Sequence, residues 1–372
     1  MSKDMNWIGS FLGQSIAIVI AIIILLEIIG LFVFDNRYYW NLRYLTYSDG
    51  AIANQTIRHS NGDSAVNLWT YAPDSTIRSI AVYADVFGAT LEYDCAFHTN
   101  SLGFIKAGSP AKPVDYLVLG DSFTEGQGGC PWLTEDAIKS DEILSDFNIL
   151  NGGLQGTGIK SFESVLELHE ESALINNVVV IAISNDFKRG DPRVWPLDNS
   201  CYRSLECGKD DYWYFDKFNT SDAELIEQAN IRRDDRKPGL KVEILRYSFT
   251  YRIIGEFSKI IQGLYSKSRI ESEEKSAPFD SYSSNFAAFE KIIEKYPKAI
   301  VLLVPQRDEV GLFGRENMDT RIVKKYFNEK GISFENCDLS ASDYMPIDGH
   351  PNVRGFSKLF SCLKNSITKY NL

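Results

Sequence analysis

The sequence contains no cluster of basic residues. Its 372 residues include 39 lysines and arginines against 50 aspartates and glutamates, giving a net charge of −11 at pH 7. Nucleic acids and anionic lipid surfaces both select clustered Lys and Arg side chains. The charge balance therefore argues against either as the main partner.

Residue types that bind metals and phosphates are also scarce. The chain has 4 histidines and 6 cysteines, and their spacings do not resemble a zinc site. The glycine-rich stretch NGGLQGTGIK differs from a phosphate-binding loop, because Ile159 separates its last glycine from Lys160. We therefore expect no metal and no organic cofactor.

One long apolar segment stands apart from an otherwise globular composition. After a short tail, residues 1–10, the segment 11–34 carries one charged side chain, Glu27. About 20 apolar residues suffice for a helix to cross the hydrocarbon core of a bilayer. The segment lacks a small-residue cleavage site, and the Tyr-Tyr-Trp cluster at 38–40 suits a membrane interface. The pattern predicts an uncleaved transmembrane anchor.

The side of the membrane is not set by the flanking charges, which are too few to orient the segment. The cysteine number is even, and a bond between Cys201 and Cys207 would close a small loop, which favours an oxidising compartment. Six reduced thiols are the alternative. We expect the main domain outside the cytoplasm, on the periplasmic side.

The chain changes character near residue 110. Residues 35–110 contain strand-like pieces with little helical periodicity and are predicted to form a small β-rich lead-in. Over 111–372, continuous Val/Ile/Leu runs alternate with amphipathic helical patterns, which predicts an α/β domain with a parallel sheet covered on both faces. An insertion at about 188–285 interrupts this rhythm. It is either a lid or acceptor-binding surface, or an ordinary surface elaboration.

Polar residues and glycines follow three of the expected strands. The first strand ends in Gly-Asp-Ser122, the second is followed by NGGLQGTG, and the third ends in Ser-Asn185-Asp. Asp348 and His350 stand just before the last expected helix. Ligands of parallel sheets bind beyond the carboxyl ends of the strands. These residues are therefore expected at one rim of the sheet.

These residue types fit nucleophilic catalysis. A serine hydroxyl such as that of Ser122 becomes a nucleophile when an imidazole, here His350, accepts its proton. The imidazole needs a carboxylate, here Asp348, to fix its tautomer. The tetrahedral intermediate needs preorganised donors, for which the backbone N–H groups of Ser122 and Gly156 and the amide of Asn185 are suitable.

The blocks GDSFTEG, NGGLQGTG, ISND and DGHPN, in this order, resemble the four motif blocks of the SGNH (GDSL-type) hydrolase superfamily. The resemblance covers most of the chain after the lead-in and implies a flavodoxin-like three-layer α/β/α fold. Residue by residue, Ser122 matches the nucleophile, Asn185 the third-block asparagine and His350 the base. Gly156 matches the second-block glycine, with Gly153 as the competing assignment.

The fourth block departs from the common D-x-x-H pattern. Ile347 stands three residues before His350, so the spacing is D-x-H with Asp348, and Asp343 is a possible substitute. The shorter spacing is similar to that of members that acetylate exopolysaccharides, such as the alginate O-acetylation proteins.

The resemblance implies a membrane-anchored serine enzyme that takes an acyl group, expected to be acetyl, from a saccharide ester. Water as acceptor makes it an esterase, whereas a sugar hydroxyl of a cell-envelope polysaccharide makes it an O-acyltransferase. A non-catalytic glycan-binding or assembly subunit on the same fold is the third alternative, and the complete residue set argues against it.

Overall fold

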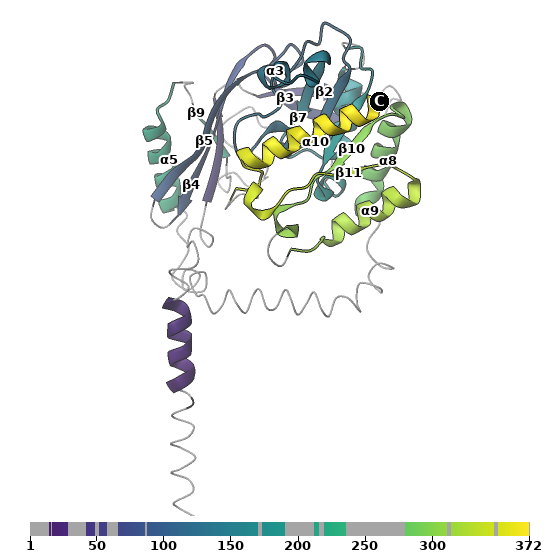
Figure 1. Cartoon of the computed structure of the whole chain (residues 1–372). Coiled ribbons are helices and arrows are strands. Elements are labelled where there is room, and N and C mark those ends of the chain that lie inside the picture. Colours follow the sequence, from purple (N-terminus) through teal and green to yellow (C-terminus); the bar gives the residue numbers. More distant parts are fainter. Residues whose placement is uncertain are drawn as a thin grey trace, which may run out of the picture. The chain divides into compact units, whose positions relative to one another are not determined.

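The computed structural model of the chain divides by internal contacts into two units, one of residues 1–42, 84–89 and 230–277 and the other of 43–83, 90–229 and 278–372. All site residues discussed below belong to the second unit. The structure describes residues 15, 17–28, 42–48, 52–57, 66–85, 88–169, 173–189, 212–215, 219–235, 280–310, 314–345 and 349–371 (Figure 1).

Residues 17–28 of the first unit are helical. Apolar side chains of this helix are exposed, including Ile18 at 60% and Leu25 at 57%. Within the described residues, no helix has both the length and the apolar character needed to cross a membrane. The rest of the expected anchor, residues 11–14, 16 and 29–34, lies outside the described part of the chain.

A sheet of five parallel strands forms the centre of the second unit, as the sequence predicts. Its order is β11-β10-β8-β6-β7, and each pair of neighbours is parallel. In chain order this is the flavodoxin-like arrangement, whose strand order reverses between β6 and β8. The strands are β6 (Tyr116–Gly120), β7 (Ile149–Gly153), β8 (Val178–Ala182), β10 (Ile300–Leu303) and β11 (Glu335–Asn336).

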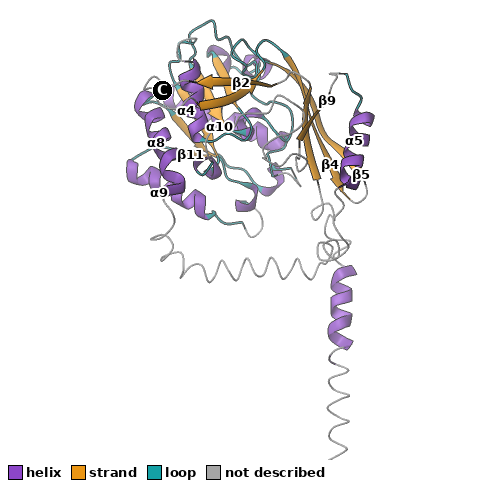
Figure 2. Ribbon diagram, turned by 180° about the vertical axis from the view of Figure 1, so that it is seen from behind, coloured by secondary structure: helices purple, strands orange, loops and turns teal. Residues whose placement is uncertain are grey.

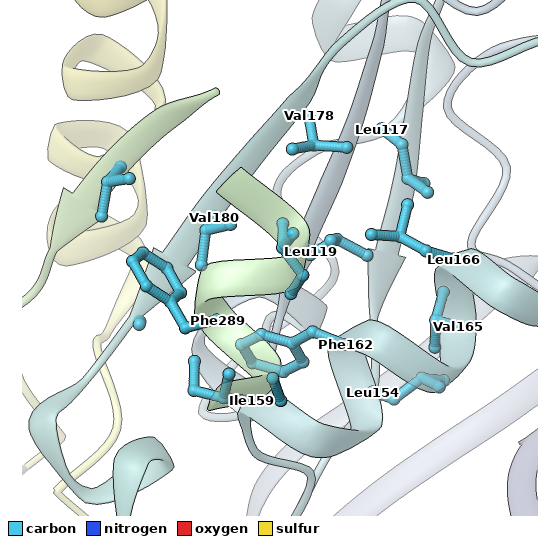
Figure 3. Close-up of a cluster of buried hydrophobic side chains, with 14 of the residues drawn as sticks. Leu117, Leu119, Leu154, Ile159, Phe162, Val165, Leu166, Val178, Val180 and Phe289 are labelled. Atoms are coloured by element: carbon cyan, nitrogen blue, oxygen red, sulfur yellow. The ribbon is translucent and has the colours of Figure 1, made fainter. Parts of the chain in front are cut away.

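Helices cover both faces of this sheet (Figures 1 and 2). Successive strand residues alternate between two cores, because side chains in a strand point to opposite faces. On one face Leu119 and Val180 pack with Phe162 and Phe289 (Figure 3). The helices of that face are α4 (Ile159–His169), α8 (Asp280–Lys295) and α9 (Met318–Lys330).

The opposite core contains strand residues such as Val118 and Val179 together with Phe356 and Leu363. Its helices are α3 (Glu135–Lys139) and α10 (Val353–Asn371). Each fully buried aliphatic or aromatic side chain contributes about 1.5–3 kcal/mol of transfer free energy. The sheet is therefore a rigid platform whose strand ends support the site.

The lead-in is rich in strands, and part of the insertion joins its sheet. One sheet has the order β5-β4-β1-β9 and a second pairs β2 with β3. Strand β9 comes from the insertion and runs parallel to β1. The elements are β1 (Leu42–Ser48), β2 (Ile52–Ile57), β3 (Val66–Tyr71), β4 (Thr76–Asp85), β5 (Gly88–His98), β9 (Tyr212–Phe215) and α5 (Asp222–Asp235).

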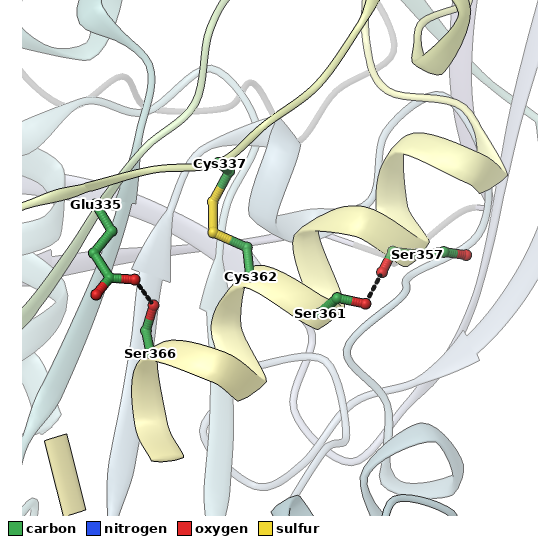
Figure 4. The surroundings of a disulfide bond; sticks show 6 residues. All are labelled: Glu335, Cys337, Ser357, Ser361, Cys362 and Ser366. Atoms are coloured by element: carbon green, nitrogen blue, oxygen red, sulfur yellow. Dashed lines mark hydrogen bonds between the residues drawn. A yellow bond between two sulfur atoms is a disulfide. The ribbon is translucent and has the colours of Figure 1, made fainter. Parts of the chain in front are cut away.

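Among the described residues, two disulfide bonds link segments that are distant in the sequence. Cys95 of β5 is bonded to Cys130, and Cys337 to Cys362 of α10 (Figure 4). The alternative of six reduced thiols is therefore wrong. The expected pair of residues 201 and 207 lies outside the described residues.

Candidate active site

Ser122 begins a short helix, α2 (Ser122–Glu125), directly after strand β6. The side chain of Asp121 caps this helix by accepting a hydrogen bond from the Phe123 N–H at 2.9 Å. The turn is tight, since a Cβ at Gly120 would lie 1.8 Å from a threonine hydroxyl of α2. The sequence Gly-Asp-Ser therefore places the serine at the carboxyl end of β6, beside the point where the strand order reverses.

His350, which is distant from Ser122 in the sequence, lies beside this serine in the structure. Its Nε2 lies 2.8 Å from Ser122 Oγ, although 228 positions separate the two residues. The histidine lies in the segment 349–352, which we call the histidine loop, and its carbonyl accepts a hydrogen bond from the Met345 N–H at 2.7 Å. The Phe123 ring lies against the imidazole, with 5.3 Å between centroids.

Gly128 provides the space that the histidine loop needs. Its φ is +108°, and a Cβ there would lie 2.7 Å from the Pro351 carbonyl and 2.9 Å from His350 Cβ. The neighbouring Cys130 is tied to the lead-in by its disulfide with Cys95. The glycine-rich stretch after the serine therefore forms the surface on which the histidine loop rests.

The expected oxyanion donors each follow a different strand of the sheet. Ser122 follows β6, Gly156 lies in the turn after β7, and Asn185 follows β8. Within the described part of the chain, the Ser122 and Gly156 N–H groups and the Asn185 amide donate no hydrogen bond. All three are thus available to a ligand.

Gly153, the competing second-block glycine, has a packing role. It ends β7, and a Cβ there would lie 2.5 Å from the Glu125 nitrogen of α2. Gly156 instead has φ +70° in the loop beyond the strand. The close contact of β7 with α2 explains why a glycine is needed at position 153. Gly156 remains the candidate oxyanion donor.

Of the two candidate acids, residue 348 lies outside the described residues. Asp343 is fully buried, and its carboxylate pairs with Lys358 at 2.7 Å and Arg354 at 2.8 Å. It also accepts the N–H and hydroxyl of Ser340, each at 2.7 Å. Burial by itself would raise the pKa of Asp343, but the Lys358 ammonium and the two Ser340 donors lower it to about 2. Asp343 thus serves to fix the start of α10.

Three charged side chains beside the serine were not predicted from the sequence as site residues. Arg189 Nη1 lies 3.0 Å from Asp121 Oδ2 and 3.1 Å from Asp186 Oδ1, and both carboxylates are fully buried. It also donates to the Thr157 carbonyl. The available signal was the pattern SNDFKR, which places an arginine one helical turn after the third-block aspartate.

The other described histidines lie away from this group. His98 Nδ1 is 2.9 Å from the Thr76 hydroxyl at an exposed position. His169 is buried edge-on to Phe104, and burial lowers its pKa to about 4. No set of three or more His, Cys, Asp or Glu side chains in the described ranges is arranged to hold a metal ion.

No protein-family model matches the chain, and no curated protein is similar to it in sequence. Among solved structures, the chain is similar to an acetylxylan esterase from Geobacillus stearothermophilus, at 12% identity over 68% of this chain and 94% of that one, with a TM-score of 0.32. It is also similar to a family two carbohydrate esterase from Clostridium thermocellum, at 10% identity over 88% and 91%, with a TM-score of 0.34. A third neighbour is an acetyl xylan esterase from Butyrivibrio proteoclasticus, at 10% identity over 88% and 87%, with a TM-score of 0.32. All three likenesses are distant.

Proposed function

We propose that this protein is a serine esterase that removes a small acyl group, foremost acetyl, from a carbohydrate. The observation that carries the proposal is the 2.8 Å separation of Ser122 Oγ and His350 Nε2 at the carboxyl end of a parallel sheet. This is the distance at which an imidazole acts as general base for a hydroxyl. Ser122 is only 4% exposed, which favours a small acyl group over a long one.

In the proposed reaction, Ser122 Oγ attacks the ester carbonyl carbon as its proton passes to His350 Nε2. The tetrahedral intermediate collapses when the bond to the sugar oxygen breaks, and that oxygen takes the proton from Nε2. The acyl group then remains on Ser122 Oγ. Water, losing a proton to Nε2, attacks this ester; the bond from the acyl carbon to Ser122 Oγ breaks, Oγ takes the proton back from Nε2, and the acyl group leaves as the free acid.

The oxyanion of each tetrahedral intermediate would be held by the N–H groups of Ser122 and Gly156 and by the amide of Asn185. Removal of one such donor typically costs about 10²–10³-fold in kcat. Asp348 stays the proposed carboxylate partner of His350, because Asp343 is already engaged by two cations.

The carbohydrate part of the proposal rests on the motif resemblance and its D-x-H spacing. The same spacing keeps O-acyl transfer to a cell-envelope polysaccharide as the second candidate, since the serine chemistry is common to both. The two reactions differ only in whether water or a sugar hydroxyl attacks the acyl-serine.

For the location, we propose attachment to a membrane through residues 11–34, with the second unit on the periplasmic side. The two disulfides support an oxidising compartment, since reducing compartments keep such thiols free. An alkaline phosphatase fused to the C-terminus would be active on the periplasmic side, and an inactive, stable fusion would contradict this placement.

The decisive experiment uses the full-length chain purified in a mild detergent. It should release p-nitrophenol from p-nitrophenyl acetate, and Ser122→Ala should abolish this release. Ser357→Ala removes an exposed hydroxyl of α10 that bonds only within its helix, and should have no effect. Activity that survives in Ser122→Ala would refute the assignment of the nucleophile.

A second assay separates the two candidate reactions. An acetylated oligosaccharide is supplied with or without an unacetylated oligosaccharide, and intact mass measurement follows the acetyl group on Ser122. Acetate release without an acceptor supports the esterase. Accumulation of acetyl-Ser122 that only a sugar acceptor discharges supports the transferase, and tight glycan binding without turnover contradicts both.

A further inference from the structure

A single nitrogen atom of Arg189 connects the loops that follow three adjacent strands. Nη1 lies 3.0 Å from Asp121 Oδ2 after β6 and 3.1 Å from Asp186 Oδ1 after β8, and it donates to the Thr157 carbonyl after β7. We infer that Arg189 is a positioning residue that holds the three oxyanion donors in register. This inference rests on the proposed serine esterase function.

Each partner of Arg189 is next in sequence to one proposed donor. Asp121 precedes Ser122, Thr157 follows Gly156, and Asp186 follows Asn185. The three loops leave separate strands, so the chain itself does not fix their relative positions beyond the sheet. Arg189 fixes their relative positions, because it binds the residue next to each donor.

The arginine is itself held in place from a neighbouring helix. Asn285 of α8 donates from Nδ2 to the Arg189 carbonyl at 2.8 Å. Its Oδ1 accepts the Lys160 N–H at the start of α4, at 3.3 Å. The backbone of Arg189 is thus anchored to the helical layer while its guanidinium reaches the strand ends.

Charge balance makes this cation necessary. Asp121 and Asp186 are both fully buried, and a buried carboxylate is costly unless it is paired. Burial first, and then the nearby Asp121 carboxylate, raise the pKa of Asp186 well above its ordinary value. Without Arg189, the two buried acids would face each other with no cation between them, so that one would take up a proton or the loops would move apart.

The same contact also directs the serine proton. Ser122 Oγ lies 2.8 Å from His350 Nε2 and 3.3 Å from Asp121 Oδ2, so its hydroxyl has two acceptors. Arg189 donates to that same Oδ2 and thereby weakens it as an acceptor. The hydroxyl is therefore directed to the imidazole, which is the arrangement that activates it.

The test replaces Arg189 by glutamine in the full-length chain and measures p-nitrophenyl acetate hydrolysis. Misplaced donors cost transition-state stabilisation, so kcat should fall roughly 10²-fold while KM stays near the wild-type value. The matched control is Lys188→Gln, which removes a neighbouring charge that pairs with Asp319 on the surface. The control should leave kcat and KM unchanged.

A second variant separates positioning from charge balance. In Arg189→Gln combined with Asp186→Asn, one of the two buried acids that Arg189 pairs with is also removed, so that Asp121 no longer faces a second carboxylate. We expect the double variant to be more stable to heat than Arg189→Gln, with kcat still about as low as in Arg189→Gln. Recovery of kcat together with stability would show that Arg189 only balances charge, and would overturn the inference.

Hydrogen exchange measured by mass spectrometry gives a readout that needs no turnover. Arg189→Gln should speed exchange in peptides covering 121–129, 153–158 and 183–188 together, whereas Lys188→Gln should not. Wild-type kcat and wild-type exchange in Arg189→Gln would refute the inference. Faster exchange in all three peptides supports the link between the loops even if the wild type lacks esterase activity. The exchange measurement therefore tests Arg189 independently of the proposed function.

Discussion

Replacing Gly128 by alanine tests whether the position of His350 controls activity. Gly128 has φ +108°, where a residue with a Cβ is strained by about 1–3 kcal/mol. Its new Cβ would lie 2.9 Å from His350 Cβ and 2.7 Å from the Pro351 carbonyl. The substitution therefore combines backbone strain with a direct push on the histidine loop.

The size of the effect follows from these distances. Carbon atoms pack at about 3.5–4.0 Å, so the loop must retreat by roughly 0.6 Å or more. The Ser122–His350 separation of 2.8 Å would then exceed the range of about 2.6–3.2 Å in which a general base works. Because a displacement of about 1 Å costs about 10²-fold, we expect kcat to fall roughly 10- to 100-fold.

Gly331→Ala is the matched control for this prediction. Gly331 ends α9 with φ +66°, and a Cβ there meets no atom within 4 Å. Gly331→Ala should lose about 1–2 kcal/mol of unfolding free energy in urea titrations, because it strains a left-handed residue. Gly128→Ala should lose at least as much, because its Cβ also meets the histidine loop. Only Gly128→Ala should lose kcat for p-nitrophenyl acetate. Equal kcat values in the two variants would refute the argument that the glycine positions the histidine.

Three further predictions concern the histidine, a disulfide and a buried acid. His350→Gln should lower kcat/KM by about 10²–10⁴-fold with unchanged thermal stability, since it removes the base alone; near-normal kinetics would contradict this. Replacing Cys95 and Cys130 by serine should lower the unfolding free energy by about 2–4 kcal/mol in denaturant titrations, because their bond spans 35 residues. The pKa of Asp343 is about 2 in the folded chain despite burial, because Lys358 and other donors stabilise its charge. Because the pKa of Asp343 is lower in the folded chain than in the unfolded chain, its charge adds to the unfolding free energy above about pH 4, and this contribution is lost as the pH falls towards 2. The contribution is at most about 2 kcal/mol, since Lys358 is partly exposed. Asp343→Asn should remove this pH-dependent loss in unfolding titrations, and an unaltered pH profile would refute the assignment.

The core of the fold was readable from local patterns. Continuous apolar runs predicted β6, β8 and β10, because strands buried on both faces have no polar alternation. The edge strand β11, by contrast, is only two residues long, Glu335–Asn336. A short edge strand has too few residues for a clear hydrophobic pattern, and the segments packed beside it decide which residues pair.

The site was readable only in part. The motif blocks named Ser122, Gly156, Asn185 and His350, and the structure places the first three after adjacent strands and the imidazole 2.8 Å from the serine. Arg189 was not predicted, because an arginine that follows a short helical turn is ordinarily a solvated surface residue. Its role depends on two buried carboxylates, and burial is not encoded in local spacing.

The sequence by itself determined the order of strands and helices along the chain and the residue types at the strand ends, since both depend on local periodicity and turn chemistry. The tertiary structure decided which of those residues meet. Cys95 pairs with Cys130, Ser122 meets His350, and one arginine reaches three loops, because packing of the helical layers on the sheet sets distances between segments far apart in sequence.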